Sequence, residues 1–213
     1  MRQRSPSQKE TSDMSLTQTC RHTVVAYSPP HRFALTSSEC DRLIRDAGPC
    51  QPEPGRPDDT PKATAPDWLY SRLVEPAAEA GEALGLDIYE WNFAYGKVLE
   101  YAPGKSLEWH TDAGFNQSAA HVALMVDAGM LEQWQVDEMN GRRLSVMLQL
   151  SDAADYVGGG LQVRSADGVL TTARRERGSV SFISATTEHS VTRIVSGCRK
   201  SAVVFIGTSP RGT

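Results

Sequence analysis

The second half of the sequence alternates short apolar runs with glycine-containing turns, and this pattern constrains the fold most. Segment 144–150 places leucine or valine at every second position, which is the pattern of a half-buried β-strand. Similar runs recur as far as residue 207, with glycine turns at 158–160 and 196–197. Because helical patterns precede these runs, we expect an α+β protein whose C-terminal half is a sandwich or barrel.

The N-terminal part of the chain carries the helical patterns. Residues 36–39 form a capping-box signature that opens a helix, and Asp67 is expected to cap a second one. A proline-rich loop at 49–66 separates the two. Residues 1–20 are polar and aperiodic, so we predict a flexible tail there and a single domain over 21–213.

Composition limits the environment and the partners of the chain. Its 213 residues carry a net charge of −4, which argues against a large nucleic-acid footprint. There is no apolar run of about 18 residues and no apolar segment behind the N-terminal charges. We therefore expect a cytoplasmic monomer or homodimer that associates with neither membranes nor nucleic acids.

A long segment, residues 113–141, interrupts the strand series. Its middle is amphipathic and contains Met125, Met130 and Trp134. One interpretation is an extra helix packed on the barrel. The other is a lid over a pocket, because long inserts between strands often carry function.

His110 and Asp112 form the first candidate metal-binding pair. On a strand, residues at i and i+2 point to the same face, so both side chains can reach one ion. His189 is the candidate third ligand. Two histidines and one carboxylate on one face of a metal leave three positions open, an arrangement that suits iron(II). The alternative interpretation of the H-x-D pair alone is an exposed strand end at which these side chains form a salt bridge.

Arg199 and Ser201 follow His189 and again share one strand face. A guanidinium beside a hydroxyl is a good receptor for a carboxylate. A buried cation near an iron triad is what a dicarboxylate co-substrate requires.

With these residues in this order and spacing, the sequence resembles the iron(II)- and 2-oxoglutarate-dependent dioxygenases of the prolyl-4-hydroxylase-like branch. The resemblance spans about residues 36–207. Four motifs carry it: Y-x-x-G-x-x-Y-x-x-H-x-D at Tyr101, Gly104, Leu107, His110 and Asp112; Y-x-G-G-x-L at Tyr156, Gly158, Gly159 and Leu161; G-S-x-x-x-F and H-x-V at Gly178, Ser179, Phe182, His189 and Val191; and G-x-R-x-S at Gly197, Arg199 and Ser201.

The resemblance implies a double-stranded β-helix, a jelly-roll or cupin-like barrel, buttressed by the N-terminal helices. It also implies that His110, Asp112 and His189 are the catalytic metal ligands for Fe(II). Arg199, Ser201 and Tyr101 would bind 2-oxoglutarate, with O2 as the other co-substrate and ascorbate in a supporting role. Hydroxylation with release of succinate and CO2 is the implied reaction, because halogenating relatives carry a small residue in place of Asp112.

One position departs from the family pattern. Leu107 stands where the branch usually has a second tyrosine that helps to hold the far carboxylate of 2-oxoglutarate. Ser201, Tyr101 or Trp109 could replace that contact. We predict substrate contacts at Trp109, Arg142 and Trp134, and a small amino-acid-like, peptidyl or natural-product substrate.

Other charged and polar residues have simpler interpretations. Arg174, Arg175 and Arg177 resemble a solvated hairpin, whereas Ser145 and Gln149 could form polar pocket walls. The alternative functions are a nucleic-acid or protein dealkylase of the same superfamily and a non-catalytic binding domain. A nucleic-acid dealkylase is disfavoured by the acidic balance of the chain.

Overall fold

The computed structural model describes residues 26–29, 33–51, 60–86, 92–114 and 118–207, so the expected tail at 1–20 lies outside the described residues. The helices in the described residues are α1 (Ser37–Ala47), α2 (Asp67–Ala83), α3 (Ala119–Asp127) and α4 (Gln133–Gly141). None of the helices in these ranges is long and apolar enough to cross a membrane.

The strands form one large and one smaller antiparallel sheet, with a short two-stranded ladder beside them. The large sheet has the order β1-β9-β5-β12-β3-β2. Its strands are β1 (Ala26–Tyr27), β9 (Val180–Ser184), β5 (Arg142–Gln149), β12 (Arg199–Gly207), β3 (Asn92–Tyr101) and β2 (Lys62–Thr64).

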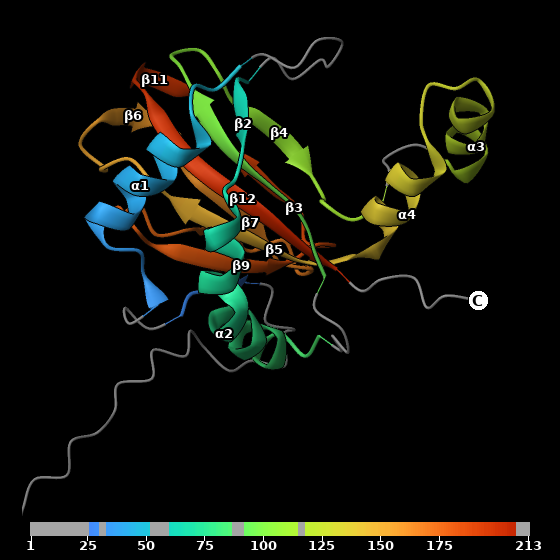
Figure 1. Cartoon of the computed structure of the whole chain (residues 1–213), viewed down its shortest axis with the longest axis horizontal. Helices are drawn as coiled ribbons and strands as arrows, with labels where there is room; N and C mark the ends of the chain where they lie inside the picture. Colours follow the sequence, from blue (N-terminus) through green and yellow to red (C-terminus); the bar gives the residue numbers. More distant parts are fainter. Residues whose placement is uncertain (1–25, 30–32, 52–59, 87–91, 115–117, 208–213) are drawn as a thin grey trace, which may run out of the picture.

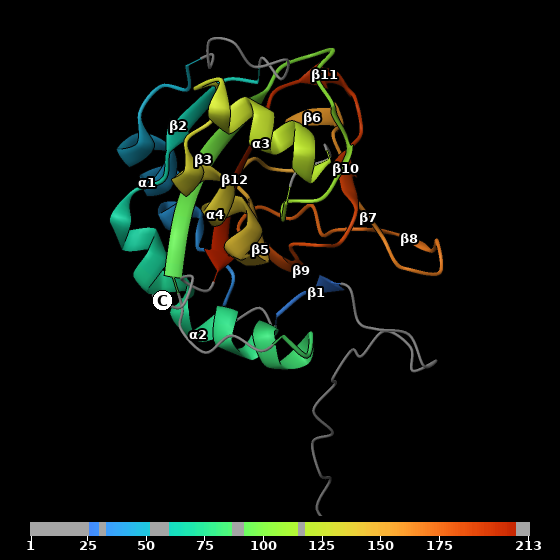
Figure 2. The same cartoon turned by 90° about the vertical axis from the view of Figure 1, so that its right-hand side faces the viewer.

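The smaller sheet has the order β4-β10-β7-β8. Its strands are β4 (Leu107–His110), β10 (His189–Val191), β7 (Leu161–Arg164) and β8 (Leu170–Thr172), while β6 (Tyr156–Gly158) pairs with β11 (Ile194–Gly197). Helices α1 and α2 lie on one side of the large sheet, and β10, β7 and β8 lie on the other (Figure 2). The expected double-stranded β-helix with buttressing helices is confirmed.

The alternation in β5 explains how the sheet joins the helices to the barrel. Leu144, Val146 and Leu148 are buried in the main hydrophobic core, which also contains residues of α1 and α2. Side chains of a half-buried strand alternate between its faces, so the residues between these leucines and valines point into the barrel. A second, smaller apolar cluster lies inside the barrel and includes Tyr101 and Tyr156.

The observed start of α1 agrees with the sequence prediction, whereas the observed start of α2 differs from it. The capping box of α1 is present: Thr36 Oγ1 accepts from the Glu39 N–H at 3.2 Å, and Glu39 Oε2 accepts from the Thr36 N–H at 2.7 Å. The prediction that Asp67 caps α2 is wrong. Pro66 occupies the cap position without a side-chain bond, and Asp67 stands in the first turn, where a carboxylate favours the helix dipole.

The segment 113–141 contains α3 and α4, which lie beyond the end of the barrel and away from α1 and α2 (Figure 1). Of their apolar side chains, only Val122 and Val136 are buried within the described part of the insert. Leu124, Met130 and Trp134 are each about two-thirds exposed, at 66%, 70% and 66%. The insert therefore has an outer apolar face that the described residues do not cover.

Candidate metal centre and anion cavity

Strand pairing brings the three predicted metal ligands together. His110 ends β4 and His189 begins β10, and these two residues are direct partners across the ladder. Asp112 follows β4 after one residue, and its N–H donates to the Ala185 carbonyl at 2.9 Å. One ligand atom from each of the three side chains lies within 4.8 Å of the others.

Backbone carbonyls fix the orientation of both imidazoles. Nδ1 of His110 lies 2.8 Å from the Glu108 carbonyl oxygen, and Nδ1 of His189 lies 3.0 Å from the Thr187 carbonyl oxygen. A carbonyl can only accept, so each Nδ1 carries the proton and each Nε2 keeps a lone pair.

These lone pairs point toward the carboxylate of Asp112. Nε2 of His110 is 3.5 Å from Oδ1, and Nε2 of His189 is 3.3 Å from Oδ2. With both protons on Nδ1, no hydrogen lies between these acceptor atoms, so a cation is the partner that satisfies all three side chains. The donor set of two nitrogens and one oxygen fits iron(II).

Burial and charge keep the ligands in their metal-binding states. Asp112 is 7% exposed, and among the described residues no hydrogen bond reaches its Oδ2. Burial by itself would raise the pKa of Asp112, but the two imidazoles of His110 and His189 beside it hold that pKa below its ordinary value. Burial lowers the pKa of His189, which therefore stays neutral near pH 7. An ionised carboxylate and a neutral imidazole are the forms that bind metals.

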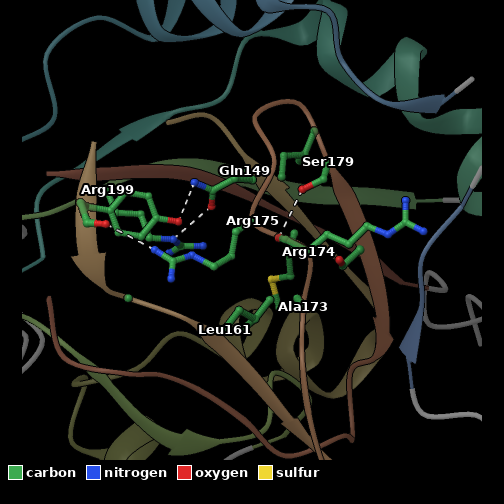
Figure 3. A pocket seen from close by; sticks show the side chains of 12 residues that line it. Gln149, Leu161, Ala173, Arg174, Arg175, Ser179 and Arg199 are labelled. Carbon is green, nitrogen blue, oxygen red and sulfur yellow. Dashed lines mark hydrogen bonds between the residues drawn. The ribbon is translucent and has the colours of Figure 1, made fainter. Parts of the chain in front are cut away.

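A second polar site surrounds Arg199 inside the barrel (Figure 3). The Arg199 side chain is 5% exposed; its Nε donates to Gln149 Oε1 at 3.1 Å, and one terminal nitrogen donates to Ser201 Oγ at 3.3 Å. Gln149 Nε2 in turn donates to the Tyr156 hydroxyl at 3.0 Å. The Tyr101 ring lies 5.5 Å from the guanidinium carbon. Gln149 is thus a polar pocket wall, as its place on β5 predicts.

None of the described residues that line this cavity is acidic, so none of them balances the charge of Arg199. The residues that line it are Met147, Leu148, Gln149, Tyr156, Gly159, Leu161, Ala173, Arg174, Arg175, Ser179, Ser181 and Arg199. Burial lowers the pKa of Arg199, since a guanidinium loses hydration there. A buried cation without a counter-ion is costly, and an anionic ligand would offset that cost. The residues therefore fit the far carboxylate of 2-oxoglutarate.

The other predicted site residues lie in different surroundings. Leu107 packs against the inner apolar cluster. The Trp109 ring stacks at 3.9 Å from the guanidinium carbon of Arg164, which also pairs with Glu188 at 3.0 Å. Trp134 projects from α4. Their contacts with a substrate stay predictions.

Arg142 has a position that the sequence did not reveal. It is 8% exposed and makes two bonds to Glu138 of α4, at 2.8 and 2.9 Å. A third bond runs to the carbonyl oxygen of Asp112 at 3.2 Å, and its guanidinium carbon lies 3.8 Å above the Phe205 ring. Arg142 therefore ties α4 to the metal-ligand loop. The only sequence signal for this role is the i, i+4 spacing of Glu138 and Arg142.

Comparison with known families identifies the class of protein. Residues 96–207 match the family model described as "2OG-Fe(II) oxygenase superfamily". Since this match covers more than half of the 213 residues, the chain belongs to that superfamily. It is an enzyme family whose members use Fe(II) and 2-oxoglutarate, in agreement with the three converging ligands. The sequence matches no curated protein.

Solved structures share the fold at low sequence identity. A 2OG-Fe(II) oxygenase family oxidoreductase from Burkholderia pseudomallei is 16% identical, with 89% of each chain covered and a TM-score of 0.60. A prolyl-4-hydroxylase from Pseudomonas putida is 19% identical, with 90% of this chain and 95% of that chain covered and a TM-score of 0.56. HygX from Streptomyces hygroscopicus, solved with nickel and 2-oxoglutarate, is 12% identical, with 88% and 84% covered and a TM-score of 0.59.

Proposed function

We propose that this enzyme hydroxylates an unactivated C–H bond of a small amino-acid-like, peptidyl or natural-product substrate. In the overall reaction, substrate, O2 and 2-oxoglutarate give the hydroxylated product, succinate and CO2. One oxygen atom of O2 enters the product and the other enters succinate. The observation that carries the proposal is a largely buried two-histidine, one-carboxylate cluster in the same barrel as a buried arginine, with no acidic side chain among the described residues that line the arginine's cavity.

Each residue has a distinct part in this proposal. His110, Asp112 and His189 would hold iron(II), with both imidazoles oriented through their Nδ1 bonds to backbone carbonyls. Arg199, assisted by Ser201 and Tyr101, would hold the far carboxylate of 2-oxoglutarate. When bound, iron(II) and 2-oxoglutarate would supply the electrons that activate O2 for oxidation of the C–H bond. The barrel residues around them exclude water and fix the position of both groups.

Asp112 favours hydroxylation over halogenation. Its carboxylate fills the space between the two imidazoles, at 3.3 and 3.5 Å from their nitrogens. In the halogenating relatives of this family, a small residue at this position makes room for a halide. The carboxylate leaves no such room here.

The neighbours support a range of substrate classes. A prolyl hydroxylase from Trichoplax adhaerens, 13% identical with a TM-score of 0.55, was solved with a peptide fragment of a hypoxia inducible factor. HygX was also solved with hygromycin B bound, at 13% identity and a TM-score of 0.58. The same barrel therefore accommodates a peptide in one protein and a natural product in another, which is why both classes are proposed for this chain.

We further propose that the insert, residues 113–141, is a lid over the substrate. Arg142 and the hydrogen bond from the Gly114 N–H to the Met139 carbonyl, at 3.0 Å, anchor the end of α4 beside Asp112. Met130 and Trp134 project from the insert and could contact an apolar substrate. Closure about this anchor would keep water from the metal and couple oxygen use to substrate binding.

The test of the function starts from the purified chain with Fe(II), 2-oxoglutarate, O2 and ascorbate. We expect succinate release that depends on Fe(II) and increases when the right substrate is added. A mass-spectrometric screen of amino acids, peptides and natural products should find a compound that gains one oxygen atom. Release of formaldehyde from a methylated nucleic acid or protein, without any hydroxylated product, would replace the hydroxylase proposal by a dealkylase.

The lid is tested by hydrogen exchange with the substrate that the screen identifies. Protection of 118–141 should rise when substrate is added at constant protein concentration. Equal protection with and without substrate would contradict the lid. Protection that rises with protein concentration instead would assign the exposed face of the insert to a dimer.

A further inference from the structure

We propose that Arg175 is a second cation for the far carboxylate of 2-oxoglutarate and replaces the hydroxyl contact that Leu107 lacks. This inference rests on the proposed co-substrate site at Arg199. Arg175 would be a further residue that contacts the co-substrate, and it lies outside the four motifs that carry the family resemblance.

The side chain of Arg175 is directed into the cavity. It comes from the connection between β8 and β9, which the sequence suggests to be a solvated hairpin. Figure 3 shows Arg175 reaching toward Arg199, whereas the neighbouring Arg174 points the other way. Both Arg175 and Arg199 line the cavity, and Arg175 is only partly exposed. The expectation of a solvated hairpin is therefore wrong for Arg175.

Within the described part of the chain, the contacts of Arg175 leave its charge without an acidic partner. Its guanidinium carbon lies 4.7 Å from the centre of the Tyr156 ring, and one terminal nitrogen donates to the Tyr156 carbonyl at 3.4 Å. Its Nε is buried and has no hydrogen-bond partner among the described residues. By contrast, Arg177 in the same connection pairs with Asp41 and Asp152.

Two guanidinium groups in one cavity repel each other unless an anion joins them. Burial lowers the pKa of Arg199, and the positive charge of Arg175 lowers it further, while Tyr101 and Tyr156 act in the opposite direction. No aspartate or glutamate stands among the residues that line the cavity. A carboxylate that accepts from both arginines would turn this repulsion into two charge-assisted hydrogen bonds.

Tyr156 connects the two arginines. Its ring stacks on Arg175, and its hydroxyl accepts from Gln149, whose side-chain oxygen accepts from Arg199. The phenolic proton can then be donated to the same carboxylate. Leu107 packs against the apolar cluster that contains Tyr156, and its aliphatic side chain offers no hydroxyl to the co-substrate.

This arrangement predicts which part of the co-substrate Arg175 recognises. 2-Oxovalerate has the same carbon chain and the same 2-oxo acid end as 2-oxoglutarate, but a methyl group replaces the far carboxylate. A residue that binds that carboxylate should affect 2-oxoglutarate only. A residue that merely supports the barrel should affect both ligands equally.

The experiment is anaerobic calorimetry of the full chain loaded with Mn(II), titrated with 2-oxoglutarate or 2-oxovalerate. Arg175→Gln should weaken 2-oxoglutarate binding at least tenfold, because hydrogen bonds between charged groups are worth about this much or more. Binding of 2-oxovalerate should change less than twofold. The control is Arg45→Gln, which removes the same charge from an exposed position on α1 outside the cavity and should change neither affinity more than twofold.

Each outcome supports the proposal or overturns it. Unchanged 2-oxoglutarate affinity in Arg175→Gln, or an equal loss for both ligands, would overturn the role of Arg175. If Arg175→Gln does not fold, Arg175→Met keeps the packing on Tyr156 without the charge and should show the same selective loss. Failure of the unaltered chain to bind 2-oxoglutarate would instead refute the proposed function itself.

Discussion

Removal of His189 should abolish the stabilisation of the protein by divalent metal. The Nε2 atom of His189 lies 3.3 Å from Asp112 Oδ2 and has no proton to share with it, so the two acceptors require a cation. The side chain is 2% exposed, and water can hardly replace the lost ligand. His189→Ala therefore removes one of three ligands without an obvious substitute.

The magnitude follows from binding linkage. At a metal concentration of about 100 times Kd, a ligand stabilises the folded state by about 2.7 kcal/mol. For a chain of this size, that corresponds to an increase in Tm of about 5–11 °C. Removal of a residue that hydrogen-bonds to a metal ligand lowers the metal affinity about 10- to 100-fold. We therefore expect removal of the ligand itself to lower it about 1,000-fold. At the same metal concentration, the metal should then stabilise the folded state of His189→Ala by less than about 0.1 kcal/mol.

The assay is thermal unfolding with and without Mn(II), a redox-stable substitute for Fe(II). His121→Ala is the matched control, because it removes an exposed imidazole of α3 and should keep the full shift in Tm. His110→Ala is a second test with a smaller folding cost, since the His110 side chain is 24% exposed. If both ligand variants kept the Mn(II) shift of the unaltered chain, the metal assignment would be refuted.

Three further predictions concern the support of the site and of the fold. Gly178→Ala should lower the free energy of unfolding by roughly 2 kcal/mol or more in urea titrations. Gly178 has φ +83°, and an added Cβ would overlap the Leu35 carbonyl oxygen; an unchanged midpoint would contradict this. Arg142→Met should weaken Mn(II) binding about 10- to 100-fold by freeing the Asp112 loop, and unaltered affinity in a metal titration would remove that role. Burial opposes ionisation of Glu39, but the capping-box hydrogen bonds and Arg72 of α2 hold its pKa below its ordinary value. Its ionised form therefore stabilises the fold above the ordinary pKa, so Glu39→Gln should cost about 0.5–1 kcal/mol at pH 7, and this difference should vanish as the pH falls through the lowered pKa of Glu39.

The sequence predicted those parts of the site that depend on strand periodicity. Residues at i and i+2 on a strand share a face, which is why His110 with Asp112 and Arg199 with Ser201 could be paired from their spacing alone. Arg142 and Arg175 could not be placed in this way. Each stands next to another arginine, Arg143 or Arg174, and only the local backbone decides which member of the pair points inward.

The two polar sites are held in one barrel by the register of the β5–β12 pair. Ser201 pairs with Gln149 at the end that holds Arg199, and Phe205 pairs with Ser145 toward the end where Arg142 contacts the Asp112 loop. The step from 145 to 149 spans about 13 Å along the strand. A slip of one residue would turn the inward polar side chains toward the helices and the apolar ones into the barrel. The apolar alternation that secures the helices on the sheet thus also fixes which side chains the barrel presents to metal and co-substrate.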